Sequence, residues 1–136
     1  MIDKMHDYLT KEMAQNKHVD SLFMLLGIVF NLMMLAINSA AQSSKDQSFL
    51  IVFFALGVLV TTITVAILLK GNDTRDKLMK GLVAMYEDND VIKYLDKSIM
   101  KNDAARSRLE IVVIVATCVT SIVIPILLKI TYKGEL

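Results

Sequence analysis

The chain has 136 residues, of which 54% are hydrophobic, and a formal net charge of +1. Because proteins that bind nucleic acid concentrate positive charge, this near-neutral chain is not expected to bind nucleic acid. Its only cysteine, Cys118, excludes an intramolecular disulfide. The hydrophobic residues gather in three runs, 21–41, 49–69 and 111–128, none of which contains Asp, Glu, Lys, Arg or His. The sequence therefore predicts an all-α integral membrane protein with three transmembrane helices.

Residues 1–20, ahead of the first run, are predicted to form an amphipathic helix, cytosolic or at the membrane interface. Four apolar residues recur at spacings of three and four: Ile2, Met5, Leu9 and Met13. The charged residues Lys4, Asp7 and Lys11 face away from them. Such a helix either lies among the lipid headgroups or docks onto another cytosolic segment. The alternative is a solvated helical extension of the first span.

The first two runs are predicted to form a transmembrane hairpin over residues 21–69, with spans at 21–41 and 49–69. Each run holds 21 residues. As a helix it would be about 31 Å long, which matches the roughly 30 Å hydrocarbon core of a bilayer. Only the short polar segment 42–47 joins the two runs. The two helices should therefore pack side by side and antiparallel.

Residues 70–110 are predicted to be a short cytosolic helical segment between spans two and three. Gly71 and Asn72 are expected to end the second span, and Asp73 or Thr74 to cap a new helix. That helix should break at residues 87–90, and a second helix should run into the third span, 111–130, which is followed by a tail, 131–136. Two short helices bury little surface alone. Their apolar residues are therefore expected to dock onto the membrane surface, the N-terminal helix or another subunit: Leu78, Leu82, Ile92, Leu95 and Ile99.

The distribution of Lys and Arg predicts the orientation of the chain. Twelve of the 15 basic residues lie in residues 1–20 and 70–110, and the other three are Lys45, Lys129 and Lys133. Segments rich in Lys and Arg stay in the cytoplasm. The N-terminus is therefore expected to be cytoplasmic and the C-terminus outside.

Each predicted span carries small and polar residues at helical spacing: Gly27, Asn31 and Asn38, then Gly57, Thr61 and Thr64, then Thr117, Thr120 and Ser121. In lipid, small residues let helices pack closely and polar side chains hydrogen-bond between helices, so helix packing is one interpretation. In the other, some of these residues, mainly Asn31, Asn38, Thr61 and Thr117, line a hydrated path. Pro125 has no N–H to donate and predicts a kink near Ser121.

The sequence has no nucleophile–base pair, phosphate-binding loop or metal-ligand spacing, so neither an enzyme nor a cofactor is expected. Glu87, Asp88 and Asp90 offer at most a weak cation contact, because the glycine and distal glutamate of an EF-hand loop are missing. Three spans are too few to enclose a channel alone. We expect a small non-catalytic, oligomeric membrane protein whose partners are the bilayer and either further copies or other membrane subunits. It would form an ion-conducting pore or, alternatively, serve as an accessory or scaffold subunit.

Overall fold

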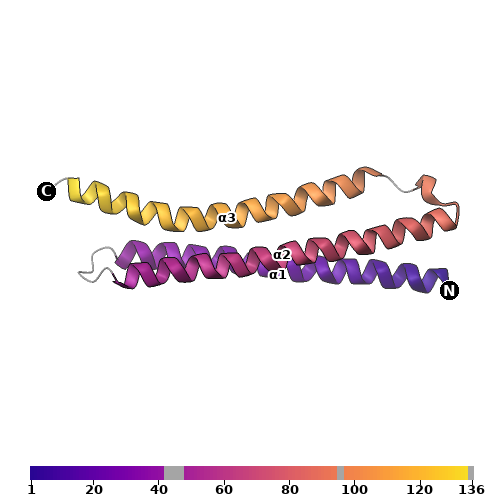
Figure 1. Cartoon of the computed structure of the whole chain (residues 1–136), viewed down its shortest axis with the longest axis horizontal. Coiled ribbons are helices and arrows are strands. Elements are labelled where there is room, and N and C mark those ends of the chain that lie inside the picture. The colour runs from indigo at the N-terminus through magenta and orange to yellow at the C-terminus, as the bar shows by residue number, and fades with distance from the viewer. Residues whose placement is uncertain (42–47, 95–96, 135–136) are drawn as a thin grey trace.

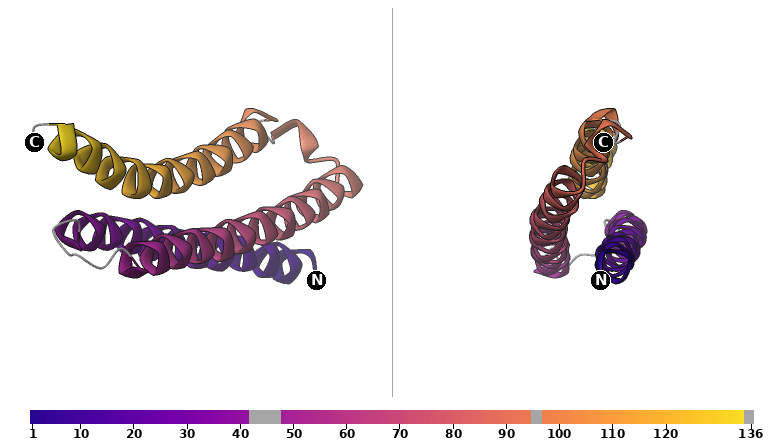
Figure 2. Two further views of the ribbon diagram at one scale, coloured as in Figure 1. Left: turned by 60° about the vertical axis from the view of Figure 1, so that its left-hand side comes forward. Right: turned by 90° about the vertical axis from the view of Figure 1, so that its right-hand side faces the viewer.

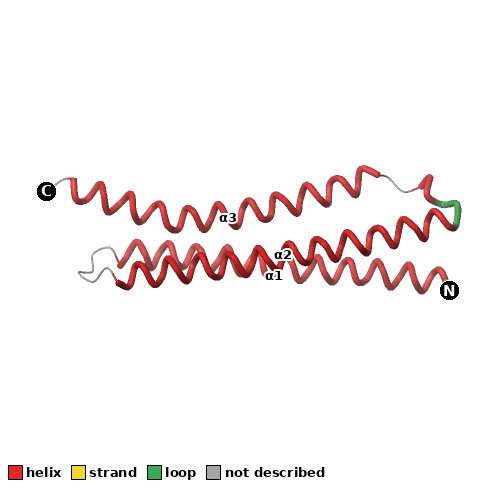
Figure 3. The backbone as a smooth tube through the Cα atoms, in the orientation of Figure 1, coloured by secondary structure: helices red, strands yellow, loops and turns green. Residues whose placement is uncertain are grey.

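Three long helices lie side by side along the length of the molecule (Figure 1). The computed structural model describes residues 1–41, 48–94 and 97–134, with the side chains of 94, 97, 99, 100 and 132–134 excepted. The helices are α1 (Ile2–Ala41), α2 (Ser48–Asp88) and α3 (Lys97–Gly134), and a short 3₁₀ turn, η1 (Ile92–Tyr94), precedes α3. Every element of the described residues is helical (Figure 3). Seen end-on, the three helices form a triangle rather than a flat layer (Figure 2).

All three helices are long and apolar enough to cross a membrane. The runs predicted as spans occupy one part of each helix, and we call them the apolar stretches: residues 21–41, 49–69 and 111–128. The helices continue beyond them, so that residues 2–20, 70–88 and 97–110 form a three-helix extension at one end of the bundle. The N-terminus lies at this end and the C-terminus at the other (Figure 1).

One helix boundary differs from the sequence-based expectation. α1 runs without interruption through residues 20 and 21, so the predicted N-terminal helix and the first span are one helix. α2 continues through Gly71 and Asn72, so the expected end of the helix there is wrong. A glycine inside a helix costs about 1 kcal/mol relative to alanine, but tertiary packing routinely overrides that preference. At Gly71 the packing is specific, because a Cβ on this residue would collide with the carboxylate of Asp20 in α1.

One face of each helix points inward, over residues 20–38 of α1, 50–82 of α2 and 107–125 of α3. The buried residues of each helix follow one another at intervals of three, four or seven, in α1 as Asp20, Gly27, Asn31, Met34 and Asn38, in α2 as Leu50, Gly57, Thr61, Thr64, Leu68, Gly71, Arg75 and Leu82, and in α3 as Ser107, Ile114, Cys118, Ser121 and Pro125. This seven-residue repeat is the pattern of a left-handed coiled coil. We call these residues the inward stripe. Most of them are small or polar, where a soluble coiled coil has Leu, Ile and Val.

Pro125 lies inside α3, which remains one helix through this position and is visibly bowed, with its middle nearest the other two helices (Figures 1 and 2). The residue four before a proline keeps a carbonyl that no helical N–H can reach. Here that residue is Ser121, and its carbonyl accepts a hydrogen bond from Nδ2 of Asn38 at 3.5 Å. The amide of α1 therefore satisfies the acceptor that the proline leaves open.

The predicted break at residues 87–90 is confirmed, since α2 ends at Asp88. Asp90 has a φ of 56°, in the left-handed region. The N–H of Asp90 donates to the carbonyl of Glu87, and the N–H of Val91 donates to that of Tyr86. These two bonds make a Schellman motif, in which the left-handed position is usually a glycine.

We expect Asp90→Gly to raise the free energy of unfolding by up to roughly 1 kcal/mol, because glycine adopts a positive φ without steric cost. Asp90→Val should lower it by about 1–2 kcal/mol, since a β-branched residue is strained there. Unfolding of the detergent-solubilised protein followed by circular dichroism measures both changes. Asp88→Gly, two residues earlier at the end of α2, is the control and should not stabilise. Equal effects at positions 88 and 90 would contradict this account of the turn.

Candidate functional site

Across the apolar stretches the usual polarity of a protein is inverted. The inward stripe holds Asn31, Asn38, Thr61 and Thr64, each no more than 7% exposed. The outer surface at the same level consists of large apolar side chains, more than a third exposed, such as Leu25, Leu32, Met33, Ile51 and Leu59. The polar side chains of these stretches are therefore enclosed within a single chain. This polar interior is the candidate site.

Asn31 joins all three helices. Its Nδ2 donates to Oγ1 of Thr117 at 3.2 Å and to the carbonyl of Ile114 at 3.4 Å, both in α3. Its Oδ1 accepts from Oγ1 of Thr61 in α2 at 3.2 Å. With 1% of its surface exposed, the side chain is removed from any surrounding medium. A buried amide that bonds in this way meets the requirement that its polar atoms find partners.

The other small and polar residues divide by depth. Gly27 packs directly against Ile114, because a Cβ at Gly27 would collide with the Ile114 side chain. Gly57 is buried, and its carbonyl lies 4.0 Å from Sγ of Cys118, which makes this a weak contact. Ser121 and Thr64 are buried, whereas Thr117 is half-buried. Thr120 is exposed, and its hydroxyl donates to the carbonyl of Ala116 within α3. All the singled-out residues except Thr117 and Thr120 thus lie on the inward stripe.

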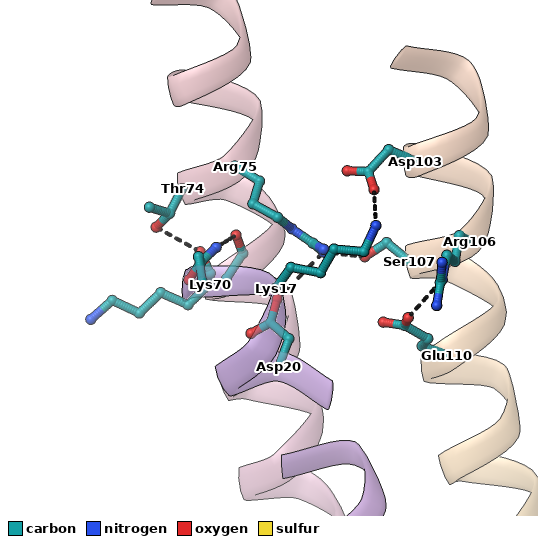
Figure 4. Close-up of polar contacts among 11 residues, drawn as sticks. Lys17, Asp20, Lys70, Thr74, Arg75, Asp103, Arg106, Ser107 and Glu110 are labelled. Carbon is teal, nitrogen blue, oxygen red and sulfur yellow. Dashed lines mark hydrogen bonds and ion pairs between the residues drawn. The ribbon is translucent and has the colours of Figure 1, made fainter. Parts of the chain in front are cut away.

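A buried ion pair lies on the inward stripe where the apolar stretches meet the extension (Figure 4). Nη2 of Arg75 lies 3.4 Å from Oδ2 of Asp20, with the two side chains 5% and 3% exposed. The same Nη2 donates to Oγ of Ser107 at 3.2 Å. Three side chains, one from each helix, therefore meet in a single layer. Burial raises the pKa of the Asp20 carboxyl above its ordinary value, and the positive charge of Arg75 opposes that rise.

Further polar contacts surround this layer. Nδ2 of Asn16 donates to the carbonyl of Gly71 at 2.7 Å, one turn from Asp20 along α1. Nζ of Lys17 lies 3.6 Å from Oδ1 of Asp103, which ties α1 to α3 at a more exposed position (Figure 4). The three helices are consequently linked pairwise at the boundary between the apolar stretches and the extension.

Asp20, Arg75 and Ser107, which form this layer, were not among the site residues predicted from the sequence. The signal that could have found them is the phase of the repeat. Asp20 is seven residues before Gly27, Arg75 is fourteen after Thr61, and Ser107 is seven before Ile114. Continuing each polar band outward in steps of seven leads to all three residues.

The extension packs through a mixture of apolar and polar contacts. Among the residues predicted to dock, Leu82 is buried and Leu78 and Ile92 are half-buried. Leu95 and the side chain of Ile99 lie outside the described residues. At the far end, Nε2 of His6 lies 2.8 Å from Oη of Tyr86, and the two rings stack. Residues 73–88 are thus helical and in contact with α1.

Glu87, Asp88 and Asp90, which were expected to give at most a weak cation contact, are all exposed at the end of α2. Among the described residues, no group of three His, Cys, Asp or Glu side chains is arranged to hold a metal ion.

Arg75→Met should lower the free energy of unfolding by about 3–5 kcal/mol, because it leaves the Asp20 carboxylate buried without its counter-charge. The double variant Asp20→Leu with Arg75→Met should recover most of that loss, since neither charge is then buried. Denaturant titration in detergent measures both. Lys77→Met, which breaks the exposed pair of Lys77 with Asp73, is the control and should cost less than about 0.5 kcal/mol. A double variant as unstable as Arg75→Met alone would show that the pair is not the source of the effect.

No family model, no curated protein and no solved structure matches the chain.

Proposed function

We propose that this chain is a non-catalytic integral membrane protein that acts as a scaffold or accessory subunit. The observation that carries the proposal is that polar side chains in the interior bond to one another between the helices of one chain. Asn31, Thr61 and Thr117 bond to one another across the three helices of one chain, and Asp20 and Arg75 pair in the same interior. The interior is therefore arranged to hold the helices in register.

The inverted polarity supports insertion in a bilayer. A surface of exposed Leu, Ile, Val, Phe and Met around a polar interior is costly in water and favourable in lipid. The apolar stretches of 21, 21 and 18 residues are about 27–31 Å long as helices, which suits the hydrocarbon core. Lys70 directly follows the second apolar stretch, and Glu110 directly precedes the third. Charged side chains therefore first occur in these helices at about the level of the Asp20 layer.

The extension supports a role in holding a partner away from the membrane. Residues 2–20 of α1 form a rod of about 28 Å at 1.5 Å per residue. The rod is continuous with the apolar stretch, so its direction is fixed by the bundle. At the far end of the rod Met1, Ile2, Met5 and Tyr8 are each at least half exposed. Val91, which follows α2, is exposed as well. Exposed apolar side chains outside the lipid are typical of contacts with another subunit or a second copy.

The sequence also suggested an ion-conducting pore made of several copies. Such a pore needs the polar faces to turn toward an axis shared between copies. Reaching that arrangement would require the bonds of Asn31 and Asn38 within the bundle to be exchanged for water. Because helix packing makes use of these groups already, we favour the scaffold.

We expect the purified protein to produce no ion flux in liposomes, measured with a potential-sensitive dye beside a channel of known conductance. Asn31→Leu should likewise produce none. It should lower bundle stability only modestly, by about 1 kcal/mol, because interhelical hydrogen bonds in membranes are individually weak. Leu32→Ala, at an exposed neighbouring position, serves as the control for stability. Flux in the wild type that Asn31→Leu abolishes while the protein stays assembled would overturn the scaffold and establish the pore.

The basic residues of the extension lead us to propose that it is cytoplasmic, with the C-terminus outside. In a Cys118→Ser background, Ser44→Cys, between α1 and α2, should react with an impermeant thiol reagent applied to intact cells. Ser98→Cys, which lies at an exposed position near the start of α3, should react only after permeabilisation. The opposite pattern of labelling would reverse the orientation.

A further inference from the structure

A groove with a volume of about 310 Å³ opens between α1 and α2 within the apolar stretches. Its walls are Phe23, Leu26 and Phe30 of α1 and Val60, Ile63 and Ile67 of α2. Gly27 and Thr64, both on the inward stripe, form its floor. The volume is within the range of ligand pockets, roughly 300–1,000 Å³, and the walls are entirely apolar.

The groove faces outward from the bundle. With 100° between successive residues of a helix, Phe23, Leu26 and Phe30 lie along one edge of the α1 stripe. Lys17, which reaches Asp103 of α3, lies along the opposite edge. α3 therefore covers the other side of α1, and Leu26 and Ile63 of the groove walls are 63% and 52% exposed. Gly27 and Thr64 are buried, so the floor of the groove lies on the inward stripe.

A basic residue lies beyond one end of this groove. Lys70 follows Ile67 by three residues, which is about 4.5 Å along the helix axis. Its side chain is exposed and points away from the layer of Asp20 and Arg75 (Figure 4). Lys70 also marks the end of the second apolar stretch, where the headgroups of a bilayer would lie. An apolar groove with a basic residue about one turn beyond its end along α2 matches a lipid that has an acyl chain and a negatively charged headgroup.

We propose that this groove binds one acyl chain of an anionic phospholipid whose phosphate lies at Lys70. The inference rests on insertion in a bilayer, as proposed above, and is independent of the scaffold role. The acyl chain fills the space between the walls and buries their exposed surface. The ammonium group of Lys70 attracts the headgroup and favours anionic over zwitterionic lipid.

The chain has no tryptophan, so a single introduced tryptophan reports the composition of lipid beside it. Phe30→Trp places the reporter in the groove, and Leu32→Trp places a matched reporter about 3 Å away in depth on the opposite, exposed side of α1. Each variant is reconstituted in phosphatidylcholine vesicles that contain a small fraction of brominated phosphatidylglycerol or brominated phosphatidylcholine. Bromine on the acyl chain quenches a tryptophan that it touches.

We expect brominated phosphatidylglycerol to be enriched beside the Phe30→Trp reporter about fivefold over brominated phosphatidylcholine, the effect of one lysine at a membrane surface. The Leu32→Trp reporter should respond equally to both lipids. Lys70→Gln should abolish the preference, whereas Lys4→Gln, far out on the extension, should not change it.

Three results would overturn the proposal. Equal quenching by both lipids at the groove would remove the headgroup site. Quenching of the Leu32→Trp reporter with none in the groove would show that protein, such as a second copy, covers it. The absence of quenching at both positions would contradict insertion in the bilayer itself, and so separates failure of the proposed membrane location from failure of the lipid site alone.

Discussion

The seven-residue repeat constrains the whole molecule, because it keeps one narrow face of each helix turned inward from the extension to the far end of the apolar stretches. A strict interval of seven is slightly shorter than two turns of an ideal helix, and helices that preserve it wind around one another. The repeat remains in phase from the apolar stretches into the charged extension. The helices meet along this interior face mainly through small and polar side chains, whereas the large apolar side chains of the apolar stretches lie mostly on the outside.

The inward-facing side chains make different contacts at different levels of the bundle. In the apolar stretches Asn31 hydrogen-bonds to both other helices. Asn38 donates a hydrogen bond to the carbonyl in α3 that has no helical partner because of Pro125. At the boundary, Asp20 and Arg75 meet beside Gly71, which leaves room for the carboxylate. Such a pair costs much of its attraction in desolvation, so its value lies in register rather than in net stability. Any sliding of α1 along α2 would leave two charges buried and unpaired.

Much of the architecture could be predicted from the sequence. The three apolar runs and the break at residues 87–90 were evident from composition and from turn-forming residues, and the described structure places helices over the runs and ends α2 at Asp88. The polar bands that include Asn31 and Thr61 were also visible. The continuity of α2 through Gly71 was not, because glycine followed by asparagine is a common helix end. Only the carboxylate of Asp20, fifty-one residues earlier in the chain, explains why glycine is needed inside this helix. Partners across such distances in sequence cannot be assigned from local propensity.

The phase of the inward stripe also limits how the chain can change in length. Each residue inserted into a helix rotates everything beyond it by about 100°. One extra residue between Asp20 and Gly27 would turn Asn31 and Asn38 out of the interior while Asp20 still faced Arg75. One set of contacts would be lost, whichever end of α1 moved. Seven residues added together restore the phase, but only if the other two helices gain the same length. The three helices therefore form a single unit for insertion and deletion, so that variants of this bundle can lengthen only in concerted steps of about two turns.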